Sequence, residues 1–163
     1  VVRSFNLVTG SELSDLAKDF ITFIMSKEGQ EIVGGEGYIS NIENPAEYVK
    51  QNGLTGRIVL AGSTSVAPVM EVLADAYKEM YSGVEIEIQQ TGSGAGITST
   101  IEGACDIGMA SRDLKDEEIA KGVEQTQMAL DGIAVIVNTE NSVEDLSTEQ
   151  IRSIFTGETT TWE

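Results

Sequence analysis

The feature that most restricts the fold is an apolar strand followed directly by a small-residue loop and a helix, an arrangement that this sequence contains twice. Residues 57–61 are predicted as a strand, residues 62–65 as a Gly/Ser/Thr loop, and a helix follows through Pro68. Residues 84–90 alternate apolar and polar side chains, which is typical of a partly exposed edge strand, and the Gly-rich loop 91–96 leads into another helix. Alternating strands and helices predict a three-layer α/β/α fold whose two loops open at the same sheet edge.

Three more segments are predicted as strands. They are residues 4–8, 106–110 and 133–137. The last of these is apolar at every position, as expected of a strand that is buried on both faces. Together with the two strands above, they predict a mixed sheet of about five strands in a single α/β lobe.

Further helices are predicted near both ends of the chain. Apolar residues recur at helical spacing through residues 13–25, after a turn in which Ser11 is the expected N-cap, and a second short helix begins at Ser26. Ser147 and Gln150 have the spacing of a capping box, which predicts the start of a late helix. The composition shifts to Asn, Glu and Gly over residues 40–56, which predicts a linker with one helical turn at residues 46–51.

Charge and composition argue against several classes of function. Lys plus Arg total 10 against 27 Asp plus Glu, so the formal net charge of −17 repels polyanions and argues against nucleic acid or an anionic membrane as partner. The sequence has no histidine, which excludes a Ser-His-Asp triad, a Cys-His pair and any metal site that needs histidine. The lone Cys105 lies in an apolar run and is expected in the core.

Motifs for nucleotides and cations do not fit. Gly92, Gly94 and Gly96 lack the spacing of a dinucleotide-binding loop, and no glycine loop is followed by the Lys-Ser/Thr of a P-loop. The acidic clusters at residues 113–118 and 140–145 lack EF-hand spacing and are expected to be solvated faces. We therefore expect no enzyme, no cofactor and no metal.

The two small-residue loops are rich in groups that can hold an anion. The first N–H groups of a helix have no partner within the helix and lie at the positive end of its dipole. Thr64 and Ser65 add hydroxyls to one helix start and Ser93 to the other. One such loop alone is equally consistent with an ordinary N-cap, but two at one sheet edge favour an oxyanion site.

A third loop follows the predicted strand 106–110. Here Ser111 and Arg112 offer a hydroxyl and a guanidinium to the same sheet edge. Alternatively, Arg112 forms a structural salt bridge with Asp113 or Glu117, and the sequence favours neither interpretation. None of the three loops supplies a base or an activated nucleophile, so binding is favoured over catalysis.

Five segments, residues 62–68, 91–97, 106–112, 131–138 and 154–157, have an order and spacing that resemble the phosphate-binding proteins of bacterial and archaeal phosphate ABC transporters. The resemblance covers nearly all of residues 57–163. It implies one lobe of the two-lobed type II periplasmic-binding fold, which closes around phosphate held by loop hydroxyls, backbone N–H groups, an arginine and an acidic acceptor for the phosphate proton.

Residues 3–39 resemble the carboxyl-terminal end of the same family, although here they precede the amino-terminal part. The resemblance therefore implies a circularly permuted order in which residues 1–39, the linker 40–56 and residues 57–163 form one lobe, with the second lobe missing. A tandem protein cut across two copies and an engineered permutant would both give this order. The chain opens at Val1 within a strand pattern, so we expect a fragment whose targeting segment lies upstream.

Position by position, the resemblance implies that phosphate is bound by Thr64, Ser65, Ser93, Gly94, Ser111 and Arg112. Some family members have an aspartate where Ser111 stands, which would accept the proton of dibasic phosphate. This departure leaves sulfate, molybdate or another tetrahedral oxyanion as alternative ligands.

The resemblance implies capture of inorganic phosphate outside the cytoplasm for an ABC importer, by a periplasmic or surface-anchored lipoprotein that delivers its ligand to a permease. A single lobe would hold only a half-site. The alternative from another class is a surface, sensor or adhesion module that keeps the fold without a ligand.

Overall fold

The computed structural model describes residues 1–161. Residues Val1–Ile133 form one compact unit, here called the sheet unit, and a second unit begins at Ala134. The expectation that one lobe extends over residues 1–163 stays a prediction.

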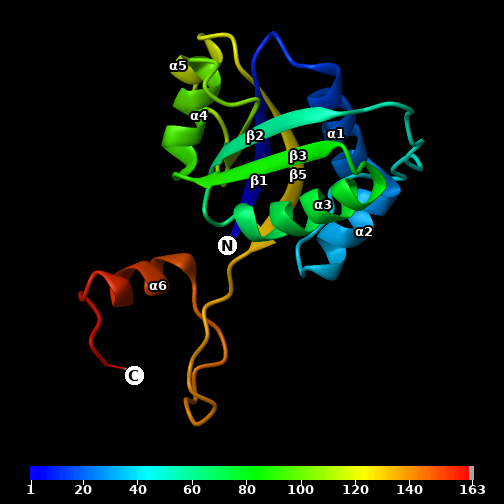
Figure 1. Ribbon diagram of the computed structural model, residues 1–163. Coiled ribbons are helices and arrows are strands. Elements are labelled where there is room, and N and C mark those ends of the chain that lie inside the picture. Colours follow the sequence, from blue (N-terminus) through cyan, green and yellow to red (C-terminus); the bar gives the residue numbers. More distant parts are fainter. Residues whose placement is uncertain (162–163) are drawn as a thin grey trace. The chain divides into compact units, whose positions relative to one another are not determined.

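The sheet unit is built around five strands (Figure 1). They are β1 (Val2–Thr9), β2 (Gly56–Gly62), β3 (Val84–Gln90), β4 (Ile107–Ala110) and β5 (Glu124–Gly132), in the order β3-β2-β4-β1-β5. β2 is parallel to both β3 and β4, whereas β1 is antiparallel to β4 and β5. The predicted mixed sheet of about five strands is confirmed, and so is the edge position of residues 84–90.

Helices cover both faces of the sheet. They are α1 (Asp15–Met25), α2 (Lys27–Gly35), α3 (Ala67–Met80), α4 (Ser93–Ile101) and α5 (Asp116–Ile119). Alternate residues of β1 contribute to two cores: Phe5 and Leu7 join the large core beneath α1, α2 and α3, and Val8 joins a smaller core with Ile97 of α4 and Leu114. Three layers therefore form, as the period of two along the strand requires.

Small residues let α4 lie close against the sheet. A Cβ atom on Gly96 would lie 2.4 Å from the carbonyl oxygen of Ala61, and one on Gly108 would lie 2.4 Å from Oγ1 of Thr100. Both distances are too short for any larger side chain without movement of the helix or the strand. The glycines thus bring the start of α4 to the end of β2.

The start of α1 differs from the prediction. Ser14, and not Ser11, is the N-cap, because its Oγ accepts a hydrogen bond from Ala17 N at 3.1 Å. The predicted start of the next helix is confirmed, since Ser26 caps α2. The apolar spacing located the helix correctly. Several polar residues, among them Ser11 and Ser14, lie near its start, so the sequence did not show which of them caps the first turn.

The linker 40–56 has no helical turn, so that prediction is wrong. Its backbone groups bond to α2 instead: Lys27 N donates to Ala46 O at 2.8 Å, and Tyr48 N donates to a carboxylate oxygen of Glu28 at 2.8 Å. The Tyr48 hydroxyl also donates to Asp19 of α1 at 2.6 Å. Tertiary hydrogen bonds have replaced the local ones that a helical turn would make.

Residues 133–137 are not the buried strand that the sequence predicts. The last backbone bond of the β1–β5 pairing joins Ile133 N to Val1 O at 2.7 Å, and no described strand pairs with residues 134–137. Ile136 is 88% exposed. A continuous apolar run becomes a buried strand only where neighbouring strands and covering layers exist, and the described residues provide neither here.

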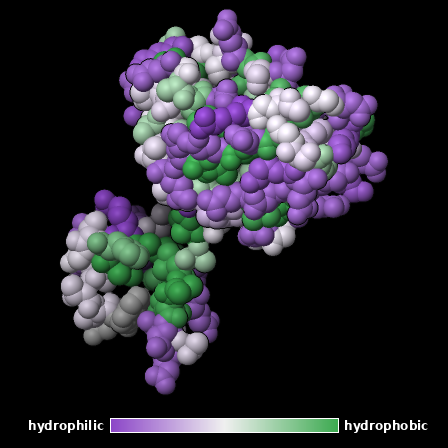
Figure 2. Space-filling model, viewed as in Figure 1, coloured by the Kyte–Doolittle hydropathy of each residue, from purple (hydrophilic) through white to green (hydrophobic). Residues whose placement is uncertain are grey.

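The second unit contains α6 (Thr148–Phe155), which begins with the predicted capping box of Ser147 and Gln150. On the visible face of this unit, Figure 2 shows a group of hydrophobic residues bordered by neutral and hydrophilic ones. Within residues 1–161, every helix is too short or too polar to cross a bilayer.

Candidate anion-binding site

The first loop, residues 62–66, joins β2 to α3. Ser63 is buried and fixes this loop: its N–H donates to Met109 O at 2.8 Å, and its Oγ accepts from Ser65 N at 3.2 Å. Thr64 is exposed and Ser65 half-buried, so both remain at the surface. α3 begins without a side-chain cap, at Val66.

The second loop, residues 91–93, joins β3 to α4 and is tied to the first. Thr91 N and Gly92 N both donate to Gly62 O, at 2.9 and 2.8 Å. Gly92 has a φ of 89°, which favours glycine, and it precedes α4 without any side-chain cap. Ser93 and the exposed Gly94 then open the helix.

The third loop, residues 111–115, follows β4 and meets the second. Ser111 N donates to Ser93 Oγ at 3.1 Å, and the two hydroxyl oxygens lie 3.2 Å apart. The structure thus brings Ser93 and Ser111 together, on loops 18 residues apart in the chain. All three loops lie at the carboxyl ends of the parallel strands β2, β3 and β4.

Arg112 forms the structural salt bridge, although with neither of the predicted partners. Its guanidinium makes two hydrogen bonds to the carboxylate of Glu118, at 2.9 and 2.8 Å, and a third to Asp113 O. The guanidinium lowers the pKa of Glu118 to about 2, and Glu118 in turn raises the pKa of Arg112. In this structure the positive charge of Arg112 is therefore paired with a carboxylate of α5.

Two residues that the sequence did not single out hold the third loop. Asn6 of β1 donates to Arg112 O and to Asp113 Oδ1, at 2.9 and 3.0 Å. Gln125 of β5 accepts from Leu114 N at 2.6 Å. Local sequence patterns could not identify either residue, because the loop groups that each one binds lie 11 or more positions away along the chain.

The arrangement offers hydroxyls and helix starts to a ligand, and the two nearby carboxylates already accept hydrogen bonds. Asp113 accepts hydrogen bonds from Asn6 and Gln125, and the two oxygens of Glu118 accept from Arg112 and Lys115 N. Cys105 is buried, and burial raises the pKa of its thiol, which favours the unreactive protonated form. These groups suit binding of an anion better than acid, base or nucleophilic chemistry.

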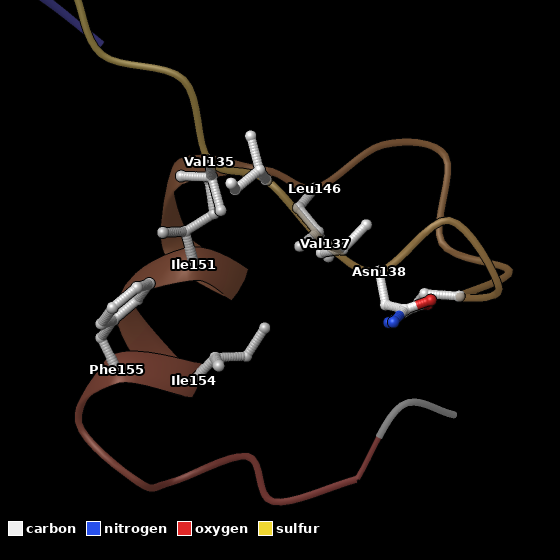
Figure 3. Close-up of a pocket in the computed structure, with 9 residues that line it drawn as sticks. Val135, Val137, Asn138, Leu146, Ile151, Ile154 and Phe155 are labelled. Atoms are coloured by element: carbon white, nitrogen blue, oxygen red, sulfur yellow. The ribbon is translucent and has the colours of Figure 1, made fainter.

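The second unit has an apolar hollow that does not suit an anion (Figure 3). Its lining is Val135, Ile136, Val137, Asn138, Asn141, Leu146, Ile151, Ile154 and Phe155. Figure 3 shows Ile151 of α6 directed toward Val135 on the segment after β5. Among the described lining residues, only two amide side chains contribute polar groups and none of the side chains is charged.

Comparison with known proteins gives consistent results. The family model of a PBP superfamily domain matches residues 49–163. The phosphate-binding protein PstS 2 of Streptococcus agalactiae is 50% identical over 164 residues, covering 99% of this chain and 55% of that protein. The chain thus spans about half the length of the curated relatives it matches.

Solved structures show the same relationship. The crystal structure of a phosphate-binding protein of a phosphate ABC transporter from Streptococcus pneumoniae has a TM-score of 0.94 and 45% identity, covering 99% of this chain and 62% of that one. A phosphate ABC transporter substrate-binding protein from Clostridium perfringens, with bound phosphate, has a TM-score of 0.59 and 50% identity, covering 66% of this chain and 44% of that one.

The order of the segments also has a precedent. A single alignment with the Streptococcus agalactiae relative passes through both residues 1–39 and residues 57–163, so that protein has the same order. Neither a cut tandem nor an engineered permutation is needed to explain it. The strands and helices that carry the three loops all lie within the matched residues 49–163, and the chain accordingly belongs to the PBP superfamily.

Proposed function

We propose that this chain supplies one half of a binding site for inorganic phosphate. The observation that carries the proposal is that α3 and α4 both begin without a side-chain cap, at loops joined through Gly62 O, whereas serines cap α1, α2 and α6. An uncapped helix start leaves N–H donors available to an oxyanion, and this holds chiefly for α4, because at α3 Ala67 N donates to Ser63 O and Pro68 has no N–H. Thr64, Ser65, Ser93, Gly94 and Ser111 are the proposed ligands.

Arg112 has a different role in this proposal from the one that the resemblance implied. It contributes positive charge near the ligand, but its hydrogen bonds go to Glu118. Neutral hydroxyls and N–H groups would therefore make most contacts. Because both oxygens of Glu118 already accept hydrogen bonds, Glu118 would not accept the phosphate proton.

The relatives support phosphate as the ligand, since they are phosphate-binding proteins of about twice this length. We propose that a second lobe supplies the remaining ligands and closes over the site. The exposed apolar side chains of the second unit would pack against that lobe. The complete protein would act outside the cytoplasm and deliver phosphate to the permease of an ABC importer.

The half-site alone would bind weakly. Each hydrogen bond to a charged group contributes about 1.5–3 kcal/mol, so several missing ligands would weaken affinity by many orders of magnitude. Calorimetry should therefore use the full-length gene product, titrated with phosphate, sulfate and molybdate. Heat of binding with sulfate or molybdate but none with phosphate would refute the ligand.

Two variants test the site. Thr64→Ala and Ser93→Ala should each weaken phosphate binding by about tenfold or more, the value of one charge-assisted hydrogen bond. Ser147→Ala, which removes the cap of α6, is the control and should leave affinity unchanged. Unaltered affinity in both loop variants would refute the site. Absence of binding heat with all three anions would instead favour the ligand-free sensor or adhesion module. Turnover of a chromogenic phosphate ester would instead indicate an enzyme.

A further inference from the structure

Asn6 occupies an unusual place for a polar residue. It lies in the middle of β1, is fully buried, and stands opposite Ala110 in the register with β4. Ala110 is the last residue before the third loop. A buried amide costs free energy unless it is hydrogen-bonded, so its partners indicate why it is there.

Those partners are two consecutive residues of the third loop. The Nδ2 group of Asn6 donates to Arg112 O at 2.9 Å and to Asp113 Oδ1 at 3.0 Å. Since a carbonyl oxygen can only accept, the amide nitrogen must face the loop. The amide oxygen is buried and has no hydrogen-bond partner among residues 1–161. Asn6 therefore directs both of its donated hydrogen bonds to the loop.

The position of Ser111 depends on this anchor. Ser111 is held on one side by Ser93 Oγ, and on the other the chain continues directly into Arg112, whose carbonyl Asn6 holds. Release of that carbonyl would free the backbone immediately after Ser111. The hydroxyl of Ser111 and its contact with Ser93 would then no longer be fixed.

We propose that Asn6 is a positioning residue for the anion site, acting through the third loop without touching the ligand. The inference rests on the proposed function. It also gives a role in the site to β1, which lies outside the residues 49–163 that the family model matches. In the permuted order, β1 precedes the other strands of the sheet unit and still supplies an anchor for their loop.

Gln30 provides a matched control. It is also a buried amide, its Nε2 donates to the carbonyls of Ile24 and Met128 at 2.9 and 3.2 Å, and its amide oxygen likewise lacks a partner in the described chain. It belongs to α2, whose Val33 packs in the large core on the opposite side of the sheet from α4. Replacing either amide by leucine should lower stability, but only Asn6 contacts the third loop.

The experiment compares Asn6→Leu with Gln30→Leu in the full-length gene product, below the unfolding temperature of both variants. Amide hydrogen exchange is measured without phosphate, and affinity for inorganic phosphate is measured by calorimetry. Asn6→Leu should speed exchange in residues 111–114 and weaken phosphate binding by about tenfold, the value of one or two hydrogen bonds. Gln30→Leu should leave both unchanged.

Asp113→Ala tests the same anchor from the exposed loop, where folding is not at risk. It removes the acceptor that Asn6 shares with Gln125 and should speed exchange of the loop and weaken binding by about threefold. Equal effects of Asn6→Leu and Gln30→Leu would overturn the proposal. If Asn6→Leu does not fold, unchanged exchange and affinity in Asp113→Ala would overturn it.

The two proposals fail in different ways. If the unmodified protein binds no phosphate, the proposed function is wrong, while hydrogen exchange still shows whether Asn6 holds the loop. If phosphate binds and the loop loosens without loss of affinity, the function stands and the positioning role is wrong.

Discussion

Two kinds of helix start occur in this protein. In α1, α2 and α6, a serine immediately before the helix accepts a hydrogen bond from the backbone N–H of the third helical residue, at 3.1, 3.3 and 3.2 Å. In α3 and α4 no side chain does so, although hydroxyl residues lie beside both. A hydroxyl near a helix start is therefore not by itself a cap, because its place relative to the first turn decides what it can reach.

The difference arises from the connections between the loops. Ser93 is the first residue of α4, one position beyond a capping residue, and its Oγ accepts from Ser111 N. Ser63 lies three positions before Val66, the capping position of α3, and its N–H bonds to β4. At these helix starts the serines join neighbouring segments to each other. Backbone N–H groups stay available at the start of α4, whereas at α3 Ala67 N donates to Ser63 O and Pro68 has no N–H.

The largest expected effect comes from separating α4 from the sheet. Gly96→Ala would place a Cβ atom 2.4 Å from both Ala61 O and Gly62 Cα, so we expect a loss of about 2–3 kcal/mol in the free energy of unfolding. Gly34→Ala in α2 meets nothing within 4 Å and should stabilise by up to about 1 kcal/mol. Urea unfolding of both variants measures the two values. A change of the same sign in both would contradict the close packing of α4.

Removing a helix cap should lower the free energy of unfolding by less than Gly96→Ala does, and it should leave the affinity for phosphate unchanged. Ser26→Ala removes the cap of α2 and should lower the free energy of unfolding by about 1 kcal/mol, without changing phosphate affinity. Ser93→Ala removes no cap, so its main effect should be on affinity. Paired unfolding and calorimetric measurements test this contrast. If Ser93→Ala lowers the free energy of unfolding but leaves phosphate affinity unchanged, Ser93 acts as a cap and α4 belongs with the capped helices.

The smallest expected effect is the loss of stability when acid protonates Glu118, the salt-bridge partner of Arg112. The pKa of Glu118 falls from 4.5 to about 2 beside Arg112, so its contribution to stability is present above pH 4.5 and is lost as the pH falls toward 2. The pair is partly exposed, which limits its contribution to about 1 kcal/mol or less.

Comparison with Glu118→Gln isolates this contribution. The difference in unfolding free energy between the natural chain and Glu118→Gln should shrink as the pH falls through this range. Glu117→Gln, at an exposed carboxylate, is the control. A difference that stays constant with pH would show that Arg112 does not hold Glu118 in solution.

Local signals in the sequence identified most of the framework. Strand periodicity placed β3 at an edge, and the Ser147–Gln150 spacing placed the start of α6. The same reasoning was wrong for residues 133–137, because an apolar run does not specify whether neighbouring strands exist. It also left Arg112 between two roles, since the reach of a guanidinium includes several carboxylates.

By itself the sequence located the strands β1 to β4 and the longer helices, because those depend on periodicity and on residues a few positions apart, but it missed β5 at Glu124–Gly132. It also located the hydroxyl-bearing loops, since each directly follows a strand. Only the tertiary structure decided which hydroxyls cap a helix, which carboxylate pairs with Arg112, and that Asn6 anchors a loop 106 residues away. Such choices depend on distances between atoms of different elements, and these are fixed only when the sheet assembles and its layers pack.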